Sequence, residues 1–360
     1  MKLLVLPGDG IGPEIMAVTR NAMDALRERF GLGYDLVERE IGLNAHARRG
    51  STLPDDILEE IRGADGALLG PVSTEDYPPA AEGGINPSGT IRKSLDLYAN
   101  IRPSRTRVGV PAMAAEMDLV VVRENTEGFY ADRNMFQGSG EFMPTPDLAL
   151  SVRKITRQGS NRIARTAFEL AMSRRKQVTV VHKANVLKVS DGLFLEEVRS
   201  VAKDFPNVEV TELLIDAMAA HLVRTPGRFD VIVTTNMYGD ILSDEAAELS
   251  GGLGLGASVN VGDDHGIAQA AHGSAPDIAG TNTANPTASL LSAAMLLDWL
   301  ALRHRDNALA AAAGHLEQAV GGVLADSTNH TPDLGGVATT EAFGAAIISA
   351  IETKETTNER

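Results

Sequence analysis

The chain has 360 residues, a formal net charge of −15 and a pI near 5.0, and it contains no cysteine. This length allows a sizeable core and indicates two domains, while the acidic balance argues against nucleic acid and anionic membranes as partners. The lack of cysteine excludes disulfides, thiolate catalysis and cysteine metal sites. With no signal peptide and no run of ~18 apolar residues, we expect a cytoplasmic protein.

Strand and helix patterns alternate along the chain, which predicts an α/β fold with a sheet that is parallel in at least one part. The expected strands are 2–6, 34–40, 66–69, 119–122, 178–181, 208–214 and 231–235. The expected helices are 13–29, 54–62, 161–174, 191–203, 216–224, one that opens with Asp240, 287–302, 308–320 and 340–352. No low-complexity linker is present, so we expect the chain to cross between domains and return.

A Gly-rich turn at residues 8–12 lies between the first strand and the first helix. Its spacing is not G-x-G-x-x-G, and no Lys-Ser or Lys-Thr pair makes it a phosphate loop. We therefore interpret it as a tight strand-to-helix turn that a ligand can approach, and not as a dinucleotide fingerprint.

The segment 127–146 is rich in Gly, Pro and Phe and has no helical period. Phe129, Phe136 and Phe142 favour burial, and a second subunit is one surface that could bury them. We expect an extended arm, with an ordinary surface loop as the alternative.

Two carboxylates follow the strand 231–235, which breaks at Asn236 and Gly239. Asp240 and Asp244 are four residues apart, so on a helix their side chains stack on one face. Like charges one turn apart repel each other, and a hard divalent cation would compensate them. Open α/β sheets bind ligands at such strand ends. The alternative is that both are first-turn acids, which the partial positive charge of the helix N-terminus favours.

Three arginines are compatible with a pocket for a polycarboxylate. Arg92, Arg102 and Arg123 carry guanidinium groups, which bind carboxylates through two parallel hydrogen bonds. As single residues, each could equally form a surface ion pair.

Three further side chains could carry chemistry. Lys183 follows the strand 178–181 and is a candidate general base, with a solvent-facing or helix-capping lysine as the alternative. Tyr130 could donate a proton or pack in the core. Asp216 repeats the position of Asp240, because it also follows a strand.

Small residues fill the segment 272–287, where they allow a ligand to approach the backbone. A carboxylate such as Asp277 can hold the two vicinal hydroxyls of a ribose, and it repels a 2′-phosphate. An ordinary turn is an equal alternative.

Together these segments resemble the β-decarboxylating dehydrogenases, which include isopropylmalate, isocitrate, homoisocitrate and tartrate/malate dehydrogenases. The resemblance extends from LPGDGIGPE to TPDLGGVATTEAF, and it is carried by IRKSLDLYANIRP, RENTEGFY, HKANVLK, NMYGDILSDEAAEL, HGSAPDIAGTNTANPTA and TPDLGG. It implies two α/β domains around a central mixed sheet, formed by 1–98 with 251–360 and by 99–250. It also implies a homodimer with shared active sites and an arm at about 127–150 that exchanges between subunits.

The resemblance assigns a role to each matching residue. The matching metal ligands are Asp240 and Asp244 of one subunit and Asp216 of the other. The catalytic residues are Tyr130, as proton donor, and Lys183, which comes from the same partner as Asp216. The matching substrate-binding residues are Arg92, Arg102, Arg123 and Ser88. The matching cofactor-binding residues are His272, Gly273, Ser274, Ala275, Pro276, Asp277, Ile278 and Asn285.

The implied reaction is the oxidative decarboxylation of a 3-carboxy-2-hydroxy acid with NAD and Mg²⁺ or Mn²⁺. Asp277 and Ile278 stand where the NADP enzymes carry Lys and Tyr, which favours NAD. The segment before Arg92 decides the substrate, and here Asn86 and Ser88 stand where isopropylmalate enzymes carry leucines. We expect a substrate of the 3-isopropylmalate class, and the tartrate/malate and isocitrate/homoisocitrate types stay open as alternatives.

Two alternatives lie outside the family. A metal-dependent hydrolase or lyase would use the three aspartates without NAD, and the segment 272–285 argues against it. A silent regulatory subunit would have lost site residues, whereas here the matching lysine, tyrosine, arginines and aspartates are all present.

Overall fold

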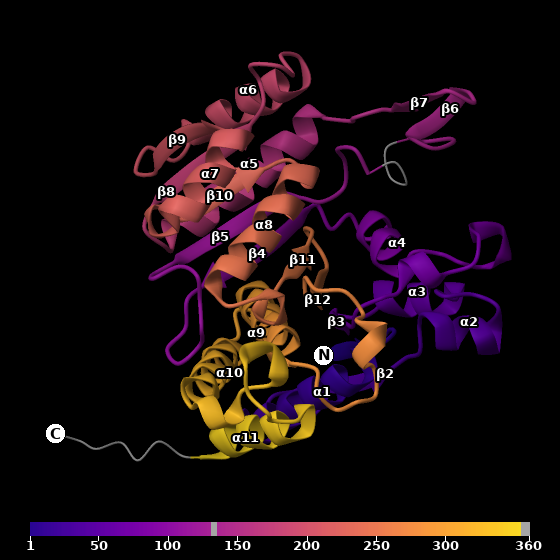
Figure 1. The fold of residues 1–360 in the computed structure, drawn as a ribbon, viewed down its shortest axis with the longest axis vertical. Coiled ribbons are helices and arrows are strands. Elements are labelled where there is room, and N and C mark those ends of the chain that lie inside the picture. The colour runs from indigo at the N-terminus through magenta and orange to yellow at the C-terminus, as the bar shows by residue number, and fades with distance from the viewer. Residues whose placement is uncertain (131–134, 354–360) are drawn as a thin grey trace.

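A ten-stranded sheet with helices on both faces forms the centre of the molecule (Figure 1). The structure is a computed structural model that describes residues 1–130 and 135–353. The strand order is β2-β1-β3-β12-β11-β4-β5-β10-β8-β9. These strands are β1 (Lys2–Leu6), β2 (Asp35–Glu38), β3 (Gly66–Leu69), β4 (Ala99–Arg105), β5 (Asp118–Glu124), β8 (Gln177–His182), β9 (Glu209–Leu214), β10 (Val231–Thr234), β11 (Val259–Val261) and β12 (Gly266–Gln269).

The sheet is parallel at both ends and antiparallel in the middle. β2, β1, β3 and β12 run parallel to one another, and so do β5, β10, β8 and β9. β11 is antiparallel to both of its neighbours, and β4 is antiparallel to β5. The expected α/β class with a mixed central sheet is confirmed.

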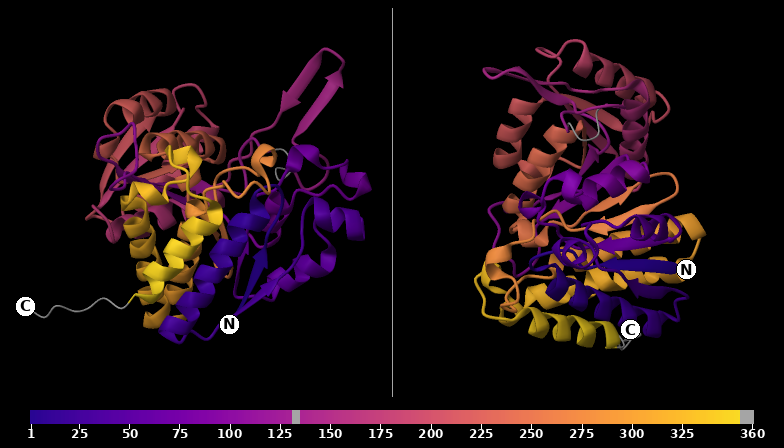
Figure 2. Two further views of the ribbon diagram at one scale, coloured as in Figure 1. Left: turned by 60° about the horizontal axis from the view of Figure 1, so that its bottom comes forward. Right: turned by 90° about the vertical axis from the view of Figure 1, so that its right-hand side faces the viewer.

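The helices lie close to their expected positions, and two short ones, α2 and α4, are additional. The helices are α1 (Gly12–Phe30), α2 (Leu43–Arg49), α3 (Asp55–Arg62), α4 (Pro87–Ser94), α5 (Arg157–Met172), α6 (Ser190–Ala202), α7 (Ile215–Arg224), α8 (Asn236–Ser250), α9 (Thr287–His304), α10 (Asn307–Ala325) and α11 (Thr340–Glu352). The first and last helices, α1 and α11, pack side by side (Figure 2).

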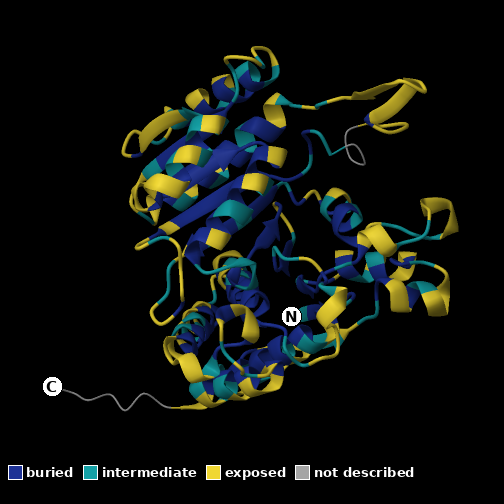
Figure 3. Cartoon of the chain, in the orientation of Figure 1, coloured by how far each residue is buried: buried dark blue, intermediate teal, exposed yellow. Residues whose placement is uncertain are grey.

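Hydrophobic cores lie on both faces of the sheet because its buried strands alternate their side chains between two sets of helices (Figure 3). Leu3 and Val5 of β1 belong to the core formed with α1, α9, α10 and α11. Leu4 belongs to the core on the opposite face, with α3 and α4. Likewise, Val231 and Ile232 of β10 belong to different cores. The division into domains 1–98 plus 251–360 and 99–250 stays a prediction.

The expected arm contains a two-stranded antiparallel hairpin that projects from the rest of the chain (Figures 1 and 3). Its strands are β6 (Glu141–Thr145) and β7 (Leu148–Ser151). Phe136 and Phe142 are exposed within this chain, so their burial by a second subunit stays a prediction. Residues 131–134 of the expected arm lie outside the described residues.

None of the helices in the described part of the chain combines the length and the apolar character that crossing a lipid bilayer requires.

Candidate active site

The candidate site is built around helix α8, which follows strand β10. The helix begins at Asn236 with Thr235 as its N-cap residue, so Asp240 lies in its second turn. The expectation that the helix opens at Asp240 is therefore wrong, and the first-turn alternative falls with it. The expected break at Gly239 lies inside the helix. A Cβ atom at Gly239 would come within 2.7 Å of the side chain of Arg123, so glycine is needed where the two elements pack.

Asp240 is the centre of a network of basic and hydroxyl side chains. Its carboxylate accepts hydrogen bonds from Nη1 of Arg123 and from the hydroxyl of Tyr130. Nη1 of Arg102 lies 3.2 Å from its Oδ1. Arg123 is almost fully buried, and it also donates from Nη2 to the Tyr130 hydroxyl at 2.9 Å and from Nε to Oδ1 of Asn236 at 2.9 Å. Four residues predicted as site residues therefore meet at one point.

Asp240 and Asp244 differ in their electrostatic surroundings. Burial raises the pKa of Asp240, but the charges of Arg123 and Arg102 outweigh this effect and hold the pKa below its usual value. Burial raises the pKa of Asp244 above its usual value, against the opposing charge of Arg102. Nη1 of Arg102 lies 3.2 Å from Oδ1 of both aspartates, so these two oxygens face a common point.

The oxygens of Asp240 and Asp244 meet at a cationic group, here Nη1 of Arg102, and carboxylate oxygens are also the ligands that a hard divalent cation prefers. Two carboxylates do not complete such a site. Within residues 1–130 and 135–353, no three Asp, Glu or His side chains are arranged to hold a metal ion, so Asp216 does not join the pair in this chain.

Lys183 and Asp216 instead form an ion pair with each other, with 2.5 Å between Nζ and Oδ1, and neither lines the cavity at Asp240. The backbone N–H of Lys183 donates to Oδ2 of Asp191 at 2.5 Å. Asp191 is fully buried and accepts a hydrogen bond from Arg153, which also donates to Oγ1 of Thr235 at 2.9 Å. Asp191 and Arg153 thus tie Lys183 to the beginning of α8, a connection absent from the sequence analysis.

Arg92 and Ser88 face the site from helix α4. Nη2 of Arg92 donates to Oε1 of Gln269 at 3.1 Å, and Nε2 of Gln269 donates to Oγ of Ser88 at 2.8 Å. Gln269 therefore fixes the direction of the Ser88 hydroxyl, which keeps its proton for a further acceptor. The helix starts after Asn86, whose side chain accepts from the N–H of Gly89 at 3.0 Å.

A cavity of about 370 Å³ lies between these groups. Its lining includes Ser88, Arg92, Arg102, Arg123, Tyr130 and Asp240. Three guanidinium groups face one carboxylate here, so the cavity suits a ligand that carries more than one carboxylate.

The loop expected to bind the cofactor rests on the Gly-rich turn. The N–H of Ile11 donates to the carbonyl of Ser274 at 2.8 Å, and the hydroxyls of Ser73 and Ser274 are 2.7 Å apart. Gly10 has a φ of 58°, and a Cβ atom there would lie 2.0 Å from the carbonyl oxygen of Ser274. The turn is a tight connection, as expected, and it also holds the loop through Ser274, which was not predicted.

Some of the predicted cofactor residues are exposed to solvent, and others are buried and hold the loop in place. Asp277 and Ile278 are exposed. Asn285 is buried, and its amide donates to Oδ2 of Asp333 at 3.0 Å while its Oδ1 accepts from the N–H of Thr287 at 3.0 Å. Asn285 therefore anchors the end of the loop to the first residue of α9.

Glu127 is a buried acid next to Asn236, at the beginning of helix α8. Burial, together with the neighbouring charge of Glu124, raises the pKa of Glu127 to about 7. Its Oε1 accepts from the N–H of Thr156 at 2.9 Å, and its carbonyl accepts from the amide of Asn236 at 2.8 Å. The folded chain thus holds a proton on this carboxyl group at pH values where the unfolded chain releases it.

We expect the free energy of unfolding to fall by up to ~3 kcal/mol as the pH rises from about 4.5 to about 7, because the folded state binds the proton more tightly. Glu127→Gln should flatten this dependence and stabilise the protein at pH 8. Urea unfolding of both proteins at pH 5 and pH 8 measures the effect. Glu75→Gln, at an exposed position, is the control. An unchanged slope in Glu127→Gln would contradict the assignment.

Comparison with known proteins places the whole chain among dehydrogenases. The profile of the family described as isocitrate/isopropylmalate dehydrogenase matches residues 2–350. An isocitrate/homoisocitrate dehydrogenase of Thermus thermophilus is 44% identical over 353 residues, which cover 98% of each chain. A 3-isopropylmalate dehydrogenase of Sulfurisphaera tokodaii is 42% identical over 94% of this chain and 95% of that protein.

The fold agrees with this placement. The crystal structure of an isocitrate dehydrogenase from Methylococcus capsulatus superposes with a TM-score of 0.86 at 40% identity, covering 98% of this chain and 99% of that one. The chain belongs to the isocitrate/isopropylmalate dehydrogenase family. It is a decarboxylating dehydrogenase, and the resemblance seen in its motifs is confirmed.

Proposed function

We propose that the chain catalyses the oxidative decarboxylation of a 3-carboxy-2-hydroxy acid to a 2-oxo acid and CO₂, with NAD as the hydride acceptor and Mg²⁺ or Mn²⁺ as the metal. The observation that carries this proposal is the convergence of Arg92, Arg102 and Arg123 with Tyr130 and Asp240 in one cavity. The arginines bind and orient the carboxylates of the acid. Tyr130, held by Arg123 and Asp240, gives its hydroxyl proton to C3 after CO₂ has left.

The remaining roles rest on the same site. A divalent ion at Asp240 and Asp244 would supply Lewis acidity at the C2 oxygen. Lys183 would accept the C2 hydroxyl proton, and Asp216 would complete the metal site, both reaching it from the partner subunit. The ion pair between Lys183 and Asp216 supports their acting as a unit. The homodimer and the cytoplasmic location stay predictions.

The polarity of the cavity supports a second substrate type beside the 3-isopropylmalate class. Asn86, Ser88 and Gly89 line it, and none of the described lining residues has an aliphatic side chain. A hydroxyl with its proton available, as at Ser88, favours a polar substituent on C3, because an alkyl group would leave that donor unpaired. A polar C3 substituent occurs in both the isocitrate/homoisocitrate and the tartrate/malate types, and the 44% identity to an isocitrate/homoisocitrate dehydrogenase favours the former as the second candidate.

The test is reduction of NAD⁺ and of NADP⁺ with 3-isopropylmalate, isocitrate, homoisocitrate, malate and tartrate, each with Mg²⁺ and with EDTA. We expect NADH formation with at least one acid, loss of activity in EDTA, and a higher kcat/KM with NAD⁺ than with NADP⁺, because the carboxylate of Asp277 repels a 2′-phosphate. A preference for NADP⁺ would overturn the role of Asp277. Activity that persists in EDTA would overturn the metal site.

A further inference from the structure

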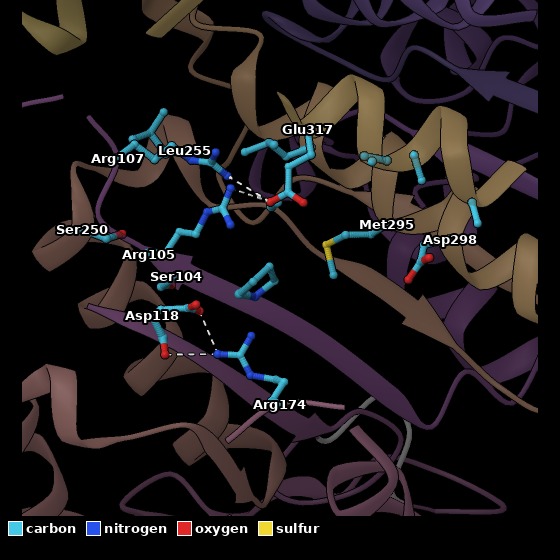
Figure 4. Close-up of a pocket in the computed structure, with 17 residues that line it drawn as sticks. Ser104, Arg105, Arg107, Asp118, Arg174, Ser250, Leu255, Met295, Asp298 and Glu317 are labelled. Atoms are coloured by element: carbon cyan, nitrogen blue, oxygen red, sulfur yellow. Dashed lines mark hydrogen bonds and ion pairs between the residues drawn. The ribbon is translucent and has the colours of Figure 1, made fainter. Parts of the chain in front are cut away.

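A second cavity, of about 360 Å³, lies between strand β4 and helices α9 and α10 (Figure 4). It shares no lining residue with the cavity at Tyr130 and Asp240. Each helix contributes one face, with residues three and four positions apart. These faces are Leu291, Ala294, Met295 and Asp298 on α9, and Ala310, Ala313, Gly314 and Glu317 on α10. The small residues of α10 leave the space that longer side chains would fill.

The guanidinium group of Arg107 lines this cavity and has no close carboxylate of its own. Its side chain is only 10% exposed, and its guanidinium forms no hydrogen bond with any described residue. Its one ion-pair contact is with Glu317, at 3.8 Å. Burial, and then the charge of Arg105, lowers the pKa of Arg107 to about 10. A buried guanidinium with no hydrogen bond is costly, and an anionic ligand would remove that cost.

The neighbouring charges do not supply that anion. Arg105 holds Glu317 at 2.8 Å, so a single carboxylate faces two guanidinium groups. Arg174 is satisfied separately, by Asp118 and Asp230, both at 2.7 Å. At this end of the cavity, Arg105 and Arg107 therefore share one carboxylate, that of Glu317.

One wall of the cavity is apolar, and an acid lies at the far end. Leu255, Leu291 and Met295 form this wall. Figure 4 shows Asp298 beyond Met295, on the side away from Arg107. Asp298 forms no ion pair or hydrogen bond with any residue that the structure describes.

We propose that this cavity binds a small amphipathic carboxylate, with its carboxylate group at Arg107 and Arg105 and its compact apolar body against Leu255, Leu291 and Met295. One further carboxylate suits two guanidinium groups that share Glu317, whereas a phosphate would bring more negative charge next to Glu317. Simple aliphatic acids and apolar α-amino acids both combine a carboxylate with an apolar body. Only the amino acids carry an ammonium group, which would lie toward Asp298, so binding of the two classes can be told apart.

Two substitutions disturb the site by different routes. Gly314→Leu fills the cavity, since a Cβ atom at Gly314 meets nothing within 4 Å. Gly322→Leu is its matched control: Gly322 lies on the same helix with equally open space, but it does not line the cavity. Both changes replace a glycine inside a helix, so both favour the helical state. Arg107→Gln removes the charge and keeps a polar side chain.

The probe is cyclohexanecarboxylate, titrated into the full chain by calorimetry. A methyl-resolved NMR spectrum, with Met295 assigned through Met295→Leu, reports the location of binding. We expect saturable binding that shifts the Met295 resonance, is lost in Gly314→Leu, is unchanged in Gly322→Leu and is weakened roughly tenfold or more in Arg107→Gln. Cyclohexylmethanol, without the charge, and inorganic phosphate, without the apolar body, should not bind there. Tighter binding of 1-aminocyclohexanecarboxylate would identify the amino acid class, and weaker binding the simple acids.

Three results would overturn the proposal. One is no saturable binding of cyclohexanecarboxylate to the wild-type chain up to about 10 mM, the range of weak ligands. Another is binding that survives both Gly314→Leu and Arg107→Gln, which would place the probe outside this cavity. The third is equal binding of cyclohexylmethanol, which would leave Arg107 without a role.

Discussion

Tyr130→Phe is expected to lower kcat by roughly 10²–10⁴-fold, the range of a positioned acid or base, while the KM of the substrate changes little. The hydroxyl of Tyr130 accepts from Arg123 and donates to Asp240, so it is oriented toward the cavity that these residues line. Removing it takes away the proposed proton donor and leaves the three arginines that bind the substrate. Steady-state kinetics with the best acid of the substrate panel measures the change.

Tyr98→Phe is the matched control for this substitution. It also removes one hydroxyl, which donates to Asp263 at 3.1 Å outside the cavity, so turnover should stay near the wild-type value. A kcat of Tyr130→Phe within a fewfold of wild type would exclude Tyr130 as the proton donor.

A mixture of two inactive variants is expected to regain activity. Lys183→Ala and Tyr130→Phe should each be nearly inactive as homodimers, because every site then lacks one catalytic group. In a hybrid dimer, one site would combine Tyr130 of one chain with Lys183 of the other, and both groups would be intact. A hybrid has one working site of two, so the purified hybrid should show ~50% of wild-type activity. In an unfractionated mixture random pairing makes about half of the dimers hybrids, and ~25% should return.

Co-expression of the two variants with different affinity tags, followed by purification on both tags, isolates the hybrid for assay. The control is co-expression of Lys183→Ala carrying each of the two tags, which should stay inactive. A hybrid as inactive as its parents would contradict the shared site and would require Lys183 to act within its own chain. An active hybrid would fit the position of Lys183 in this chain, where it pairs with Asp216 outside the cavity.

The sequence predicted the elements that carry a strong periodic signal. Residues 2–6 and 66–69 were predicted with the bounds that the structure has, because each is a short, mostly apolar run that ends before a turn, at Pro7-Gly8 or at Gly70. β11 was missed because it is three residues long and has Asn260 at its centre. α4 was missed because it is short and contains Gly89, and its start depends on a cap by the Asn86 side chain.

In the candidate site, too, the residues with a local sequence motif were predicted, and those whose role depends on distant partners were not. Arg102, Arg123, Tyr130 and Asp240 were predicted from motifs, and the structure brings them into contact. Gln269 was missed because its role depends on two partners far away in the sequence, which only the folded sheet brings together. Asp191 and Arg153 were missed because the link that they form between Lys183 and Thr235 exists only in the folded chain.

The position of β11 and β12 in the sheet has a consequence for biosynthesis. These two short strands are the only connection between the group β2-β1-β3 and the group β4-β5-β10-β8-β9 in the described sheet, yet they come after all the others in the sequence. Until the ribosome has added residues 259–269, β3 and β4 each present an unpaired edge, and such edges pair with other chains. A nascent chain that stalls before this point would carry two half-sheets with open edges, exposed to aggregation.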